Sequence, residues 1–280
     1  EHIMAADSFL IPDPQSIRFS VSHYRSSEYE IHYHTFYELY YFVGGDADYL
    51  VEGSEYRLTP HSLLLLSPYA FHGVRVNSDA PYVRCVIQFA PEALSAERRA
   101  FLLSSFPGSK KNSPKEVFYE HTEQFGLYDC LDRLIQSQKQ PAALREQYYP
   151  IYLEALLAQV SLMCQTLSPT QVSSSAPEAI TDILSYLNDH LTDPITLDGL
   201  SRRFYISKYY MNRAFKRATG TTVMDYIINK RVIMARQIIR NGQTAADAAI
   251  ASGFGDYSSF YRAYKKVIGC SPAEDKQSLG

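Results

Sequence analysis

The chain has 280 residues, of which 46% are hydrophobic and 20% are charged, with a formal net charge of −3 at pH 7. This composition is that of an ordinary globular protein, and the length allows two domains. No run of eighteen apolar residues exists, which argues against a membrane partner. Cys85, Cys130, Cys164 and Cys270 are widely separated and form no C-x-x-C pair. We therefore expect free thiols in a reducing compartment, the cytoplasm, and no zinc site.

Charge is distributed unevenly along the chain. Residues 178–280 carry 14 basic and 10 acidic side chains, whereas the remainder carries 13 basic and 20 acidic side chains. A basic C-terminal part joined to an acidic N-terminal part is typical of a nucleic-acid-binding domain attached to a sensor domain.

From Ser16 to Phe89 the sequence has a period of two and is rich in β-forming residues, with Gly and Pro between the runs. Short strands at this spacing predict a small antiparallel sandwich or barrel. The expected strands are Arg18–Tyr24, Tyr37–Val43, Asp48–Glu52, Glu55–Leu58, Ser62–Leu66 and Tyr82–Phe89.

From Thr122 to Leu167 the apolar period becomes helical. In the second helix of this stretch the apolar positions alternate by four and three residues, which predicts a helix–helix seam. A dimer interface and packing against the chain's own barrel are both consistent with it. Residues 168–177 have no such rhythm and are typical of a flexible linker. The seam consists of Tyr149, Leu153, Leu156, Val160, Met163 and Leu167.

Two C-terminal segments, residues 197–217 and 245–266, each predict a short helix, a tight turn and a second, more basic helix. This is the layout of a helix-turn-helix, whose second helix enters the major groove of DNA. Ser207 and Asp256 are suitable N-caps for the second helices, and Gly253 supplies backbone freedom at the second turn. The side chains expected on the buried side of the second helices are Met211, Phe215, Phe260 and Tyr264.

Residues 222–240, between these segments, have apolar side chains at helical spacing and end at Asn241-Gly242, a pattern typical of a left-handed C-cap. A helix of this length is roughly 28 Å long, which is of the order of the ~34 Å repeat of DNA. We therefore expect one rigid helix to hold two recognition helices over successive segments of the major groove.

A specific set of motifs runs through the C-terminal part: Leu200-Ser201, Ile206-Ser207, Tyr210-Met211, Arg213, Phe215-Lys216-Arg217, Thr219-Gly220, Ala235-Arg236, Gly253-Phe254, Ser259-Phe260, Arg262, Tyr264-Lys265-Lys266, Gly269 and Ser271-Pro272. With these motifs the segment resembles the DNA-binding domain of the AraC/XylS family of bacterial transcription regulators. Ala245 and Ala248 stand where the family usually has isoleucine, Tyr264 replaces a phenylalanine, and Asp275 replaces a common aromatic residue. These departures predict a lighter core in the second half.

The resemblance implies which side chains contact DNA. The base-reading positions carried over from the family are Tyr209, Asn212, Arg213, Tyr257, Ser258, Ser259 and Arg262. Arginine with guanine and asparagine with adenine are the favoured bidentate pairs. For each lysine the alternative is a solvated helix face. Ser207 is also among the expected DNA-binding residues. Contacts to phosphate are expected from Lys208, Tyr210, Lys216, Arg217, Lys265 and Lys266.

In the N-terminal part the order of His32-Tyr33-His34, Glu38, Gly44, Pro60, Pro68 and His72 resembles the cupin-like sensor domain that precedes such DNA-binding domains. The resemblance implies an effector pocket inside the barrel. Residues 9–12 resemble the N-terminal arm that in some relatives folds over the effector, with a loose terminus as the alternative.

We expect the effector to be a sugar or another small polar metabolite. Three histidines and a glutamate in this order are also the ligand set of metal-binding cupins, and they would suit Fe, Mn, Ni or Zn. His32 and His34 share one face of a strand, as chelation requires. We favour a pocket without metal or cofactor. The alternatives are a cupin-type metalloenzyme and purely structural, hydrogen-bonding roles for these residues. The expected effector-binding residues are Tyr24, His32, His34, Glu38, Tyr40, His72 and Arg84.

The expected fold class is an α+β multidomain protein. A cupin-like antiparallel β-barrel occupies residues 8–108, a helical segment with a dimerisation role 109–167, a linker 168–177, and an all-α domain of two helix-turn-helix units joined by a long helix 178–280. We expect a ligand-responsive transcription regulator and not an enzyme. Its expected partners are double-stranded DNA, a small-molecule effector, a second copy of the chain and RNA polymerase. In a further alternative, the barrel only dimerises a DNA-binding protein.

Overall fold

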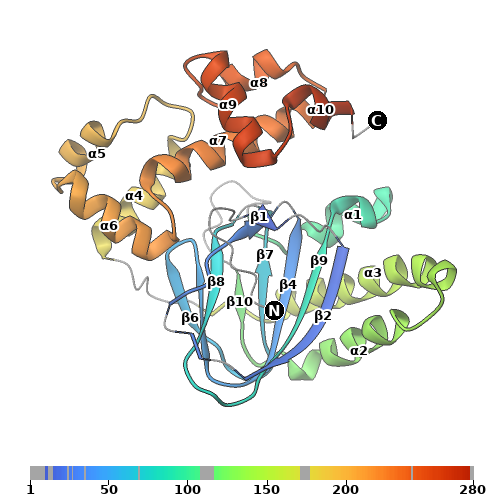
Figure 1. Cartoon of the computed structure of the whole chain (residues 1–280). Helices are drawn as coiled ribbons and strands as arrows, with labels where there is room; N and C mark the ends of the chain where they lie inside the picture. The colour runs from blue at the N-terminus through green and yellow to red at the C-terminus, as the bar shows by residue number, and fades with distance from the viewer. Residues whose placement is uncertain are drawn as a thin grey trace. The chain divides into compact units, whose positions relative to one another are not determined.

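The structure, a computed structural model, describes residues 10–11, 15–23, 25–26, 28–34, 36–68, 70–107, 117–170, 177–240 and 242–277. The chain divides into a β-rich N-terminal unit and a helical C-terminal unit (Figure 1). The expected combination of an antiparallel β domain and an all-α domain is confirmed. None of the described helices is long and apolar enough to cross a membrane.

The described residues of the β-rich unit form three sheets. The largest is antiparallel, with the order β10-β7-β4-β9-β2, and a smaller sheet has the order β6-β5-β8. A third consists of the parallel pair β1 and β3. The strands are β1 (Leu10–Ile11), β2 (Gln15–Ser22), β3 (Tyr33–His34), β4 (Tyr37–Gly44), β5 (Ala47–Val51), β6 (Ser54–Arg57), β7 (Ser62–Leu66), β8 (His72–Val76), β9 (Tyr82–Phe89) and β10 (Phe118–Tyr119).

The predicted strands agree with these bounds to within a few residues, and β7 and β9 match them fully. β8 was not predicted from the sequence. It is only five residues long and contains Gly73, which weakens a strand pattern because it offers no side chain to pack.

Alternate residues along the strands of the large sheet pack into two different hydrophobic cores, one on each face of the sheet. On β4, Tyr40 and Phe42 belong to a core shared with the small sheet, which includes Tyr49 of β5 and Val76 of β8. Leu39 and its neighbours on β7 and β9 face the other way. Because side chains alternate along a strand, a sheet that is covered on both faces is apolar at both odd and even positions.

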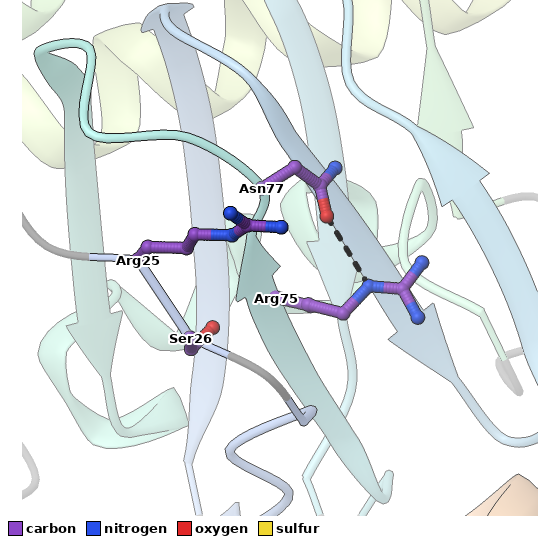
Figure 2. Close-up of a pocket in the computed structure, with 4 residues that line it drawn as sticks. All are labelled: Arg25, Ser26, Arg75 and Asn77. Atoms are coloured by element: carbon purple, nitrogen blue, oxygen red, sulfur yellow. Dashed lines mark hydrogen bonds between the residues drawn. The ribbon is translucent and has the colours of Figure 1, made fainter.

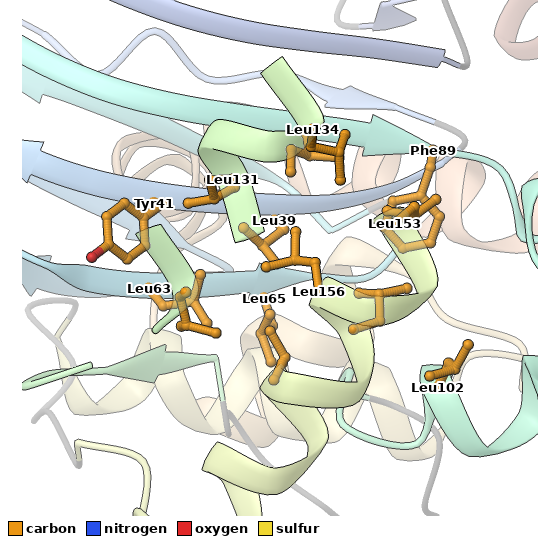
Figure 3. Packing of buried hydrophobic residues seen from close by; sticks show 14 of the residues in the cluster. Leu39, Tyr41, Leu63, Leu65, Phe89, Leu102, Leu131, Leu134, Leu153 and Leu156 are labelled. Atoms are coloured by element: carbon orange, nitrogen blue, oxygen red, sulfur yellow. The ribbon is translucent and has the colours of Figure 1, made fainter. Parts of the chain in front are cut away.

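Helices cover the second face of the large sheet (Figure 3). They are α1 (Ala96–Leu103), α2 (Leu127–Ser137) and α3 (Ala142–Thr166), with short 3-10 turns η1 (Pro91–Ala93) and η2 (Glu123–Phe125) between the elements.

The dimer interpretation of the predicted seam on α3 is wrong for its buried members. Leu153, Leu156, Val160 and Met163 are fully buried in the core that α3 forms with the large sheet. Tyr149 and Leu167 at its ends are partly buried against the same core. The apolar second face of the sheet needs a cover, and this stripe of α3 provides it.

The C-terminal unit consists of helices. They are α4 (Glu178–Asp189), α5 (Leu197–Phe204), α6 (Lys208–Thr219), α7 (Val223–Arg240), α8 (Ala245–Ala251), α9 (Tyr257–Ile268) and α10 (Pro272–Gln277). α7 has 18 residues and is therefore roughly 27 Å long. The four apolar side chains predicted to face inward from the second helices, Met211, Phe215, Phe260 and Tyr264, are all buried.

The second half of this unit has the expected lighter core, in which Ala248 and Ala249 pack beside Phe260 and Tyr264. The structure also explains the acidic residue in place of an aromatic one. Asp275 is buried, and it accepts hydrogen bonds from the Tyr264 hydroxyl at 2.7 Å and from the Arg236 guanidinium. The two departures, tyrosine for phenylalanine and aspartate for an aromatic residue, are thus partners in one polar contact.

Candidate functional site

The helix-turn-helix units are built by local capping. Ser207 Oγ accepts from the Tyr210 N–H at 3.2 Å, and Asp256 Oδ1 accepts from the Ser259 N–H at 2.7 Å. The predicted N-caps of α6 and α9 are therefore confirmed. Each cap satisfies a backbone N–H that a helix start leaves without a partner. In this way the sequence fixes where each second helix begins.

Gly253 in the second turn is required by its surroundings as well as its backbone. Its φ is +86°, and a Cβ at this position would lie 2.6 Å from the carbonyl oxygen of Thr192. In the first turn Tyr205 adopts the left-handed conformation instead, with φ of 55°. Arg231 of α7 donates hydrogen bonds to the backbone carbonyls of Leu191 and Asp193, on either side of Thr192. The loop before α5 is thus held against both α7 and the second turn.

Exposed basic side chains occupy equivalent places on α6 and α9. Arg213 and Arg262 each follow their N-cap by six residues and are exposed. Lys216 and Lys265 follow three residues later, and both are exposed. Since the opposite side of each helix is buried in the core, these cations share one outward face. The arrangement supplies two matching positive surfaces that can meet phosphates and base edges.

The other residues predicted to contact DNA differ in exposure, and some already have partners within the protein. Asn212 is partly buried, and its Oδ1 accepts from the Val223 N–H at 3.3 Å, at the start of α7. A bidentate pair with adenine uses both the oxygen and the nitrogen of the amide. Asn212 therefore caps α7 here instead of offering both groups. Exposed members of the set are Ser207, Lys208, Tyr209, Tyr210, Arg217, Tyr257, Ser258 and Lys266, while Ser259 is partly exposed.

A second cluster lies inside the β-rich unit, where the structure brings His32, His34 and His72 together. The backbones of His32 and His72 pair, with N–H to carbonyl distances of 2.9 and 3.0 Å. The pairing requires Gly73, because a Cβ there would lie 2.6 Å from the Glu30 carbonyl oxygen. One ring nitrogen from each histidine lies within 4.8 Å of the other two. Residues distant in the sequence thus form one compact group of imidazoles.

Each of the three rings is oriented by a backbone carbonyl. Nδ1 lies 3.0 Å from the Glu30 oxygen in His32, 2.9 Å from the Phe36 oxygen in His34, and 2.8 Å from the Ala70 oxygen in His72. A carbonyl can only accept a hydrogen bond, so each Nδ1 carries a proton. Burial lowers the pKa of His32 and of His72, which favours their neutral forms.

Glu38 is the buried acid of this cluster. Its carboxylate lies 3.0 Å from His34 Nε2 and 3.9 Å from His72 Nε2, and it accepts from Gln88 Nε2 at 2.6 Å and from the Tyr49 hydroxyl at 3.3 Å. Burial alone would raise the pKa of Glu38, but the His34 hydrogen bond and the nearby imidazoles outweigh it and lower the pKa overall. The group is therefore held as a carboxylate.

Sequence reasoning did not find Tyr49 and Gln88. Gln88 lies opposite Glu38 in the register of β4 and β9, so the strand pairing, had it been known, would have identified it. Tyr49 comes from the other sheet, and its ring lies 6.1 Å from that of His72. These two side chains complete the hydrogen bonding of the carboxylate.

Three predicted effector-binding residues are not part of this cluster: two have other partners, and one lies outside the described residues. The Tyr40 hydroxyl is paired with the Tyr82 hydroxyl, and the Tyr40 ring lies 4.7 Å from that of Tyr49. Arg84 donates to Ser22 Oγ at 3.0 Å and lies over the Tyr82 ring. It is four residues from Gln88 along β9, roughly 13 Å between backbone positions. Tyr24 lies outside the described residues, as do residues 9 and 12 of the expected arm.

A hollow of about 520 Å³ lies among Arg25, Ser26, Arg75 and Asn77 (Figure 2). Arg75 alternates along β8 with Val74 and Val76, which belong to the core between the sheets, so the hollow is on the outer side of the small sheet. The Arg75 guanidinium already forms ion pairs with Asp48 and Glu55. The charge of Arg75 at this hollow is therefore paired within the protein.

Comparison with known proteins gives two family matches. A helix-turn-helix domain model matches residues 200–278, and the model of the AraC-like ligand binding domain matches residues 15–161, more than half of the chain.

Over 231 residues the chain is 26% identical to an uncharacterized HTH-type transcriptional regulator, YbfI, of Bacillus subtilis (strain 168), which covers 81% of this chain and 79% of the relative. It is 20% identical over 256 residues to the HTH-type transcriptional activator RhaS of Escherichia coli (strain SE11), covering 90% and 88%. A solved structure of ToxT from Vibrio cholerae covers 94% of this chain and 99% of its own, with 15% identity and a TM-score of 0.37. From the two domain matches and the capped helix pairs that carry them, the chain belongs to the AraC/XylS family of transcription regulators and has the family's ligand-binding domain.

Proposed function

We propose that this regulator reads two successive segments of the major groove with α6 and α9, and that an effector bound in the β-rich unit changes its action. The observation that carries the proposal is the matched placement of Arg213 and Arg262, each exposed and each six residues after its N-cap. Two equivalent arginines, one on each helix, are suited to bidentate contacts with guanine.

The long helix between the two units supports simultaneous reading. α7 is roughly 27 Å long, and its N-terminus is capped by Asn212 of α6. At its other end α7 packs against α8 and α9 through Val232, Ala235 and Ile239. One continuous helix thus connects both recognition helices, and the exposed lysines beside the arginines would position the unit on phosphates.

Sensing is proposed for the interior of the β-rich unit, around His32, His34, Glu38 and His72, with Tyr40 and Arg84 further along the same face. A metalloenzyme built on the same residues would need room for a substrate beside the ion. Phe36, stacked on the His34 ring at 4.2 Å, and Tyr49 are both buried and fill the space beside the cluster. Relatives that cover most of the chain are named as transcriptional regulators, which also favours regulation over catalysis.

A homodimer is proposed through a different face of α3 from the one that the sequence pattern suggested. Ile151 and Leu162 are 62% and 52% exposed, respectively. They belong to a stripe in which exposed residues alternate by four and three, the spacing of a helix–helix contact. The two alanines of the stripe would let a second helix approach closely. The stripe consists of Leu144, Tyr148, Ile151, Ala155, Ala158 and Leu162.

The test of the proposal starts from a pool of random DNA duplexes. We expect the full-length protein to select a site with two conserved blocks about one helical turn apart. Arg213→Ala should abolish preference in one block only, and Arg262→Ala in the other only. Selection of a single block that both variants lose together would contradict reading by two helices. Transcription from a template carrying the selected site, with purified RNA polymerase, then tests the proposed polymerase partner.

A further inference from the structure

The second ring nitrogens of the three clustered histidines are short of hydrogen-bond donors. All three Nδ1 atoms donate to backbone carbonyls. In a neutral imidazole the second nitrogen is then an acceptor only. One ring nitrogen of each histidine lies within 4.8 Å of the other two, and Nε2 of His34 and of His72 lie 3.0 and 3.9 Å from the Glu38 carboxylate. Such a group is stabilised by a cation placed among its members.

The surroundings of two ring nitrogens, His34 Nε2 and His72 Nε2, show why a cation would stabilise the cluster. His34 Nε2 lies 3.0 Å from Glu38 Oε2, so two acceptors face each other unless a proton or a metal ion lies between them. His72 Nε2 is buried and has no hydrogen-bond partner among the described residues. A proton on His34 would satisfy the first contact but would leave the nitrogen of His72 unpaired. A metal ion satisfies both.

We propose that His32, His34, His72 and Glu38 bind one divalent first-row transition metal ion, and that this ion is the effector of the regulator. The inference rests on the proposed function, because it names the effector of the same sensing site. Three imidazoles and one carboxylate are a donor set suited to Fe²⁺, Ni²⁺ or Zn²⁺.

The surroundings of the cluster fit an ion better than an organic molecule. Phe36, stacked on the His34 ring at 4.2 Å, and Tyr49, whose ring lies 6.1 Å from that of His72, are both almost completely buried beside it. A sugar would have to displace these rings, whereas an ion needs only the space among the three ring nitrogens, which lie within 4.8 Å of one another. The proposal thus differs from the effector expected from the sequence, a small polar metabolite.

The residues around the ligands provide the support that a metal site needs. Backbone carbonyls hold the three rings, and Gln88 and Tyr49 hold the carboxylate. Such outer contacts fix the orientation and the tautomer of metal ligands. Gln88 is thus a positioning residue in this site, acting through Glu38.

Binding also offers a way to produce a signal. Metal–nitrogen bonds of about 2.0–2.1 Å place two nitrogens on one ion at roughly 3 Å from each other, whereas the three ring nitrogens here are spread over as much as 4.8 Å. The ion would draw His32 and His34, which precede β4, toward His72 of β8. An effector changes an equilibrium when it binds one arrangement better than another, and this closing of the rings is such a difference.

The metal arm of the test uses full-length protein stripped with a chelator and titrated calorimetrically with ZnCl₂ and NiCl₂. We expect one equivalent per chain, with affinity at least tenfold weaker in His72→Gln and His32→Gln, and 10–100-fold weaker in Gln88→Leu. His190→Gln, which changes an exposed histidine, is the matched control and should bind as the wild type does. His32 is only partly buried, so its variant answers the question if His72→Gln does not fold.

The DNA arm uses the same preparations and the site selected from the random pool. We expect the ion to change DNA affinity or transcription from that site at least fivefold in the wild type, and not in His32→Gln. Failure of the wild type to bind metal, or full binding by His32→Gln, would overturn the site. Metal binding that leaves both DNA affinity and transcription unchanged would overturn its role as effector. Loss of DNA binding in every state would instead count against the proposed function.

Discussion

Asp275 and Arg236 form a bidentate ion pair in the second half of the helical unit. Arg236 Nε lies 2.8 Å from Asp275 Oδ2, and Nη2 lies 2.7 Å from Oδ1. Asp275 is buried, and Tyr264 donates to it as well. The pair connects α10 to α7, and through Tyr264 to α9, so it fixes the end of the chain against the second helix-turn-helix.

Removing the acid should destabilise this unit strongly. Asp275→Ala removes the bidentate partner of the largely buried Arg236 guanidinium, for which we expect a loss of roughly 3 kcal/mol in the free energy of unfolding at pH 7. Tyr264→Phe removes one hydrogen bond and should cost about 1 kcal/mol. Thermal unfolding followed by circular dichroism measures both. Equal stability of Asp275→Ala and the wild type would show that the pair contributes nothing net.

The same pair makes stability depend on acid. Burial alone would raise the pKa of Asp275, but the hydrogen bonds from Arg236 and Tyr264 outweigh it and lower the pKa below its ordinary value. The pair thus contributes its full stabilisation above about pH 4, the ordinary range of an aspartate, and loses it as the pH falls through the lowered pKa. The difference in melting temperature between wild type and Asp275→Ala should therefore narrow below about pH 4. A constant difference from pH 7 to pH 3 would contradict this.

Arginine and lysine on α6 should differ in what they read. Arg213→Ala should lose about 1–3 kcal/mol at the specific site and relax the preference at one base pair, whereas Lys216→Ala should weaken all sequences similarly and reduce the salt dependence. Fluorescence anisotropy with specific and random duplexes at several salt concentrations separates the two. Equal losses on both duplexes for Arg213→Ala would assign that residue to phosphate.

Two glycines close together in the second turn should respond differently to a methyl group. Gly253→Ala places a Cβ 2.6 Å from the Thr192 carbonyl oxygen at a positive φ, and should destabilise the fold by more than about 1 kcal/mol. Gly255→Ala is the matched control, since a Cβ there meets no atom within 4 Å. Thermal unfolding and DNA affinity of the two variants give the comparison. If Gly253→Ala were as stable as Gly255→Ala, the loop at Thr192 would be able to move away from the added methyl group without loss of stability.

The two faces of α3 should separate dimerisation from folding. Ile151→Glu with Leu162→Glu changes the exposed stripe, and should give folded monomers because charges would face each other across the contact. Leu156→Glu with Val160→Glu instead buries charges in the protein's own core, and should unfold the β-rich unit. Analytical ultracentrifugation and circular dichroism measure the two effects. A folded Ile151→Glu, Leu162→Glu protein that is still dimeric would refute the exposed stripe as the interface.

Local features were readable from the sequence because they depend on neighbours in the chain. Ser207 and Asp256 cap helices through an N–H three residues away, and the inward side chains of α6 and α9 follow from the helical period. Strands β7 and β9 followed from runs of β-forming residues bounded by turns. The family resemblance rested on the same short motifs.

Tertiary structure alone decided which partners meet. The seam of α3 is equally compatible with a second copy and with the protein's own sheet, and only the apolar second face of that sheet made the choice. The pairing of Glu38 with Gln88 depends on the order and register of β4 and β9, and that of His32 with His72 on how the segment before β4 crosses β8. A periodic pattern tells which way a side chain faces along its own element. It does not tell which distant element comes to face it, because that is set by the free energy of packing the whole unit.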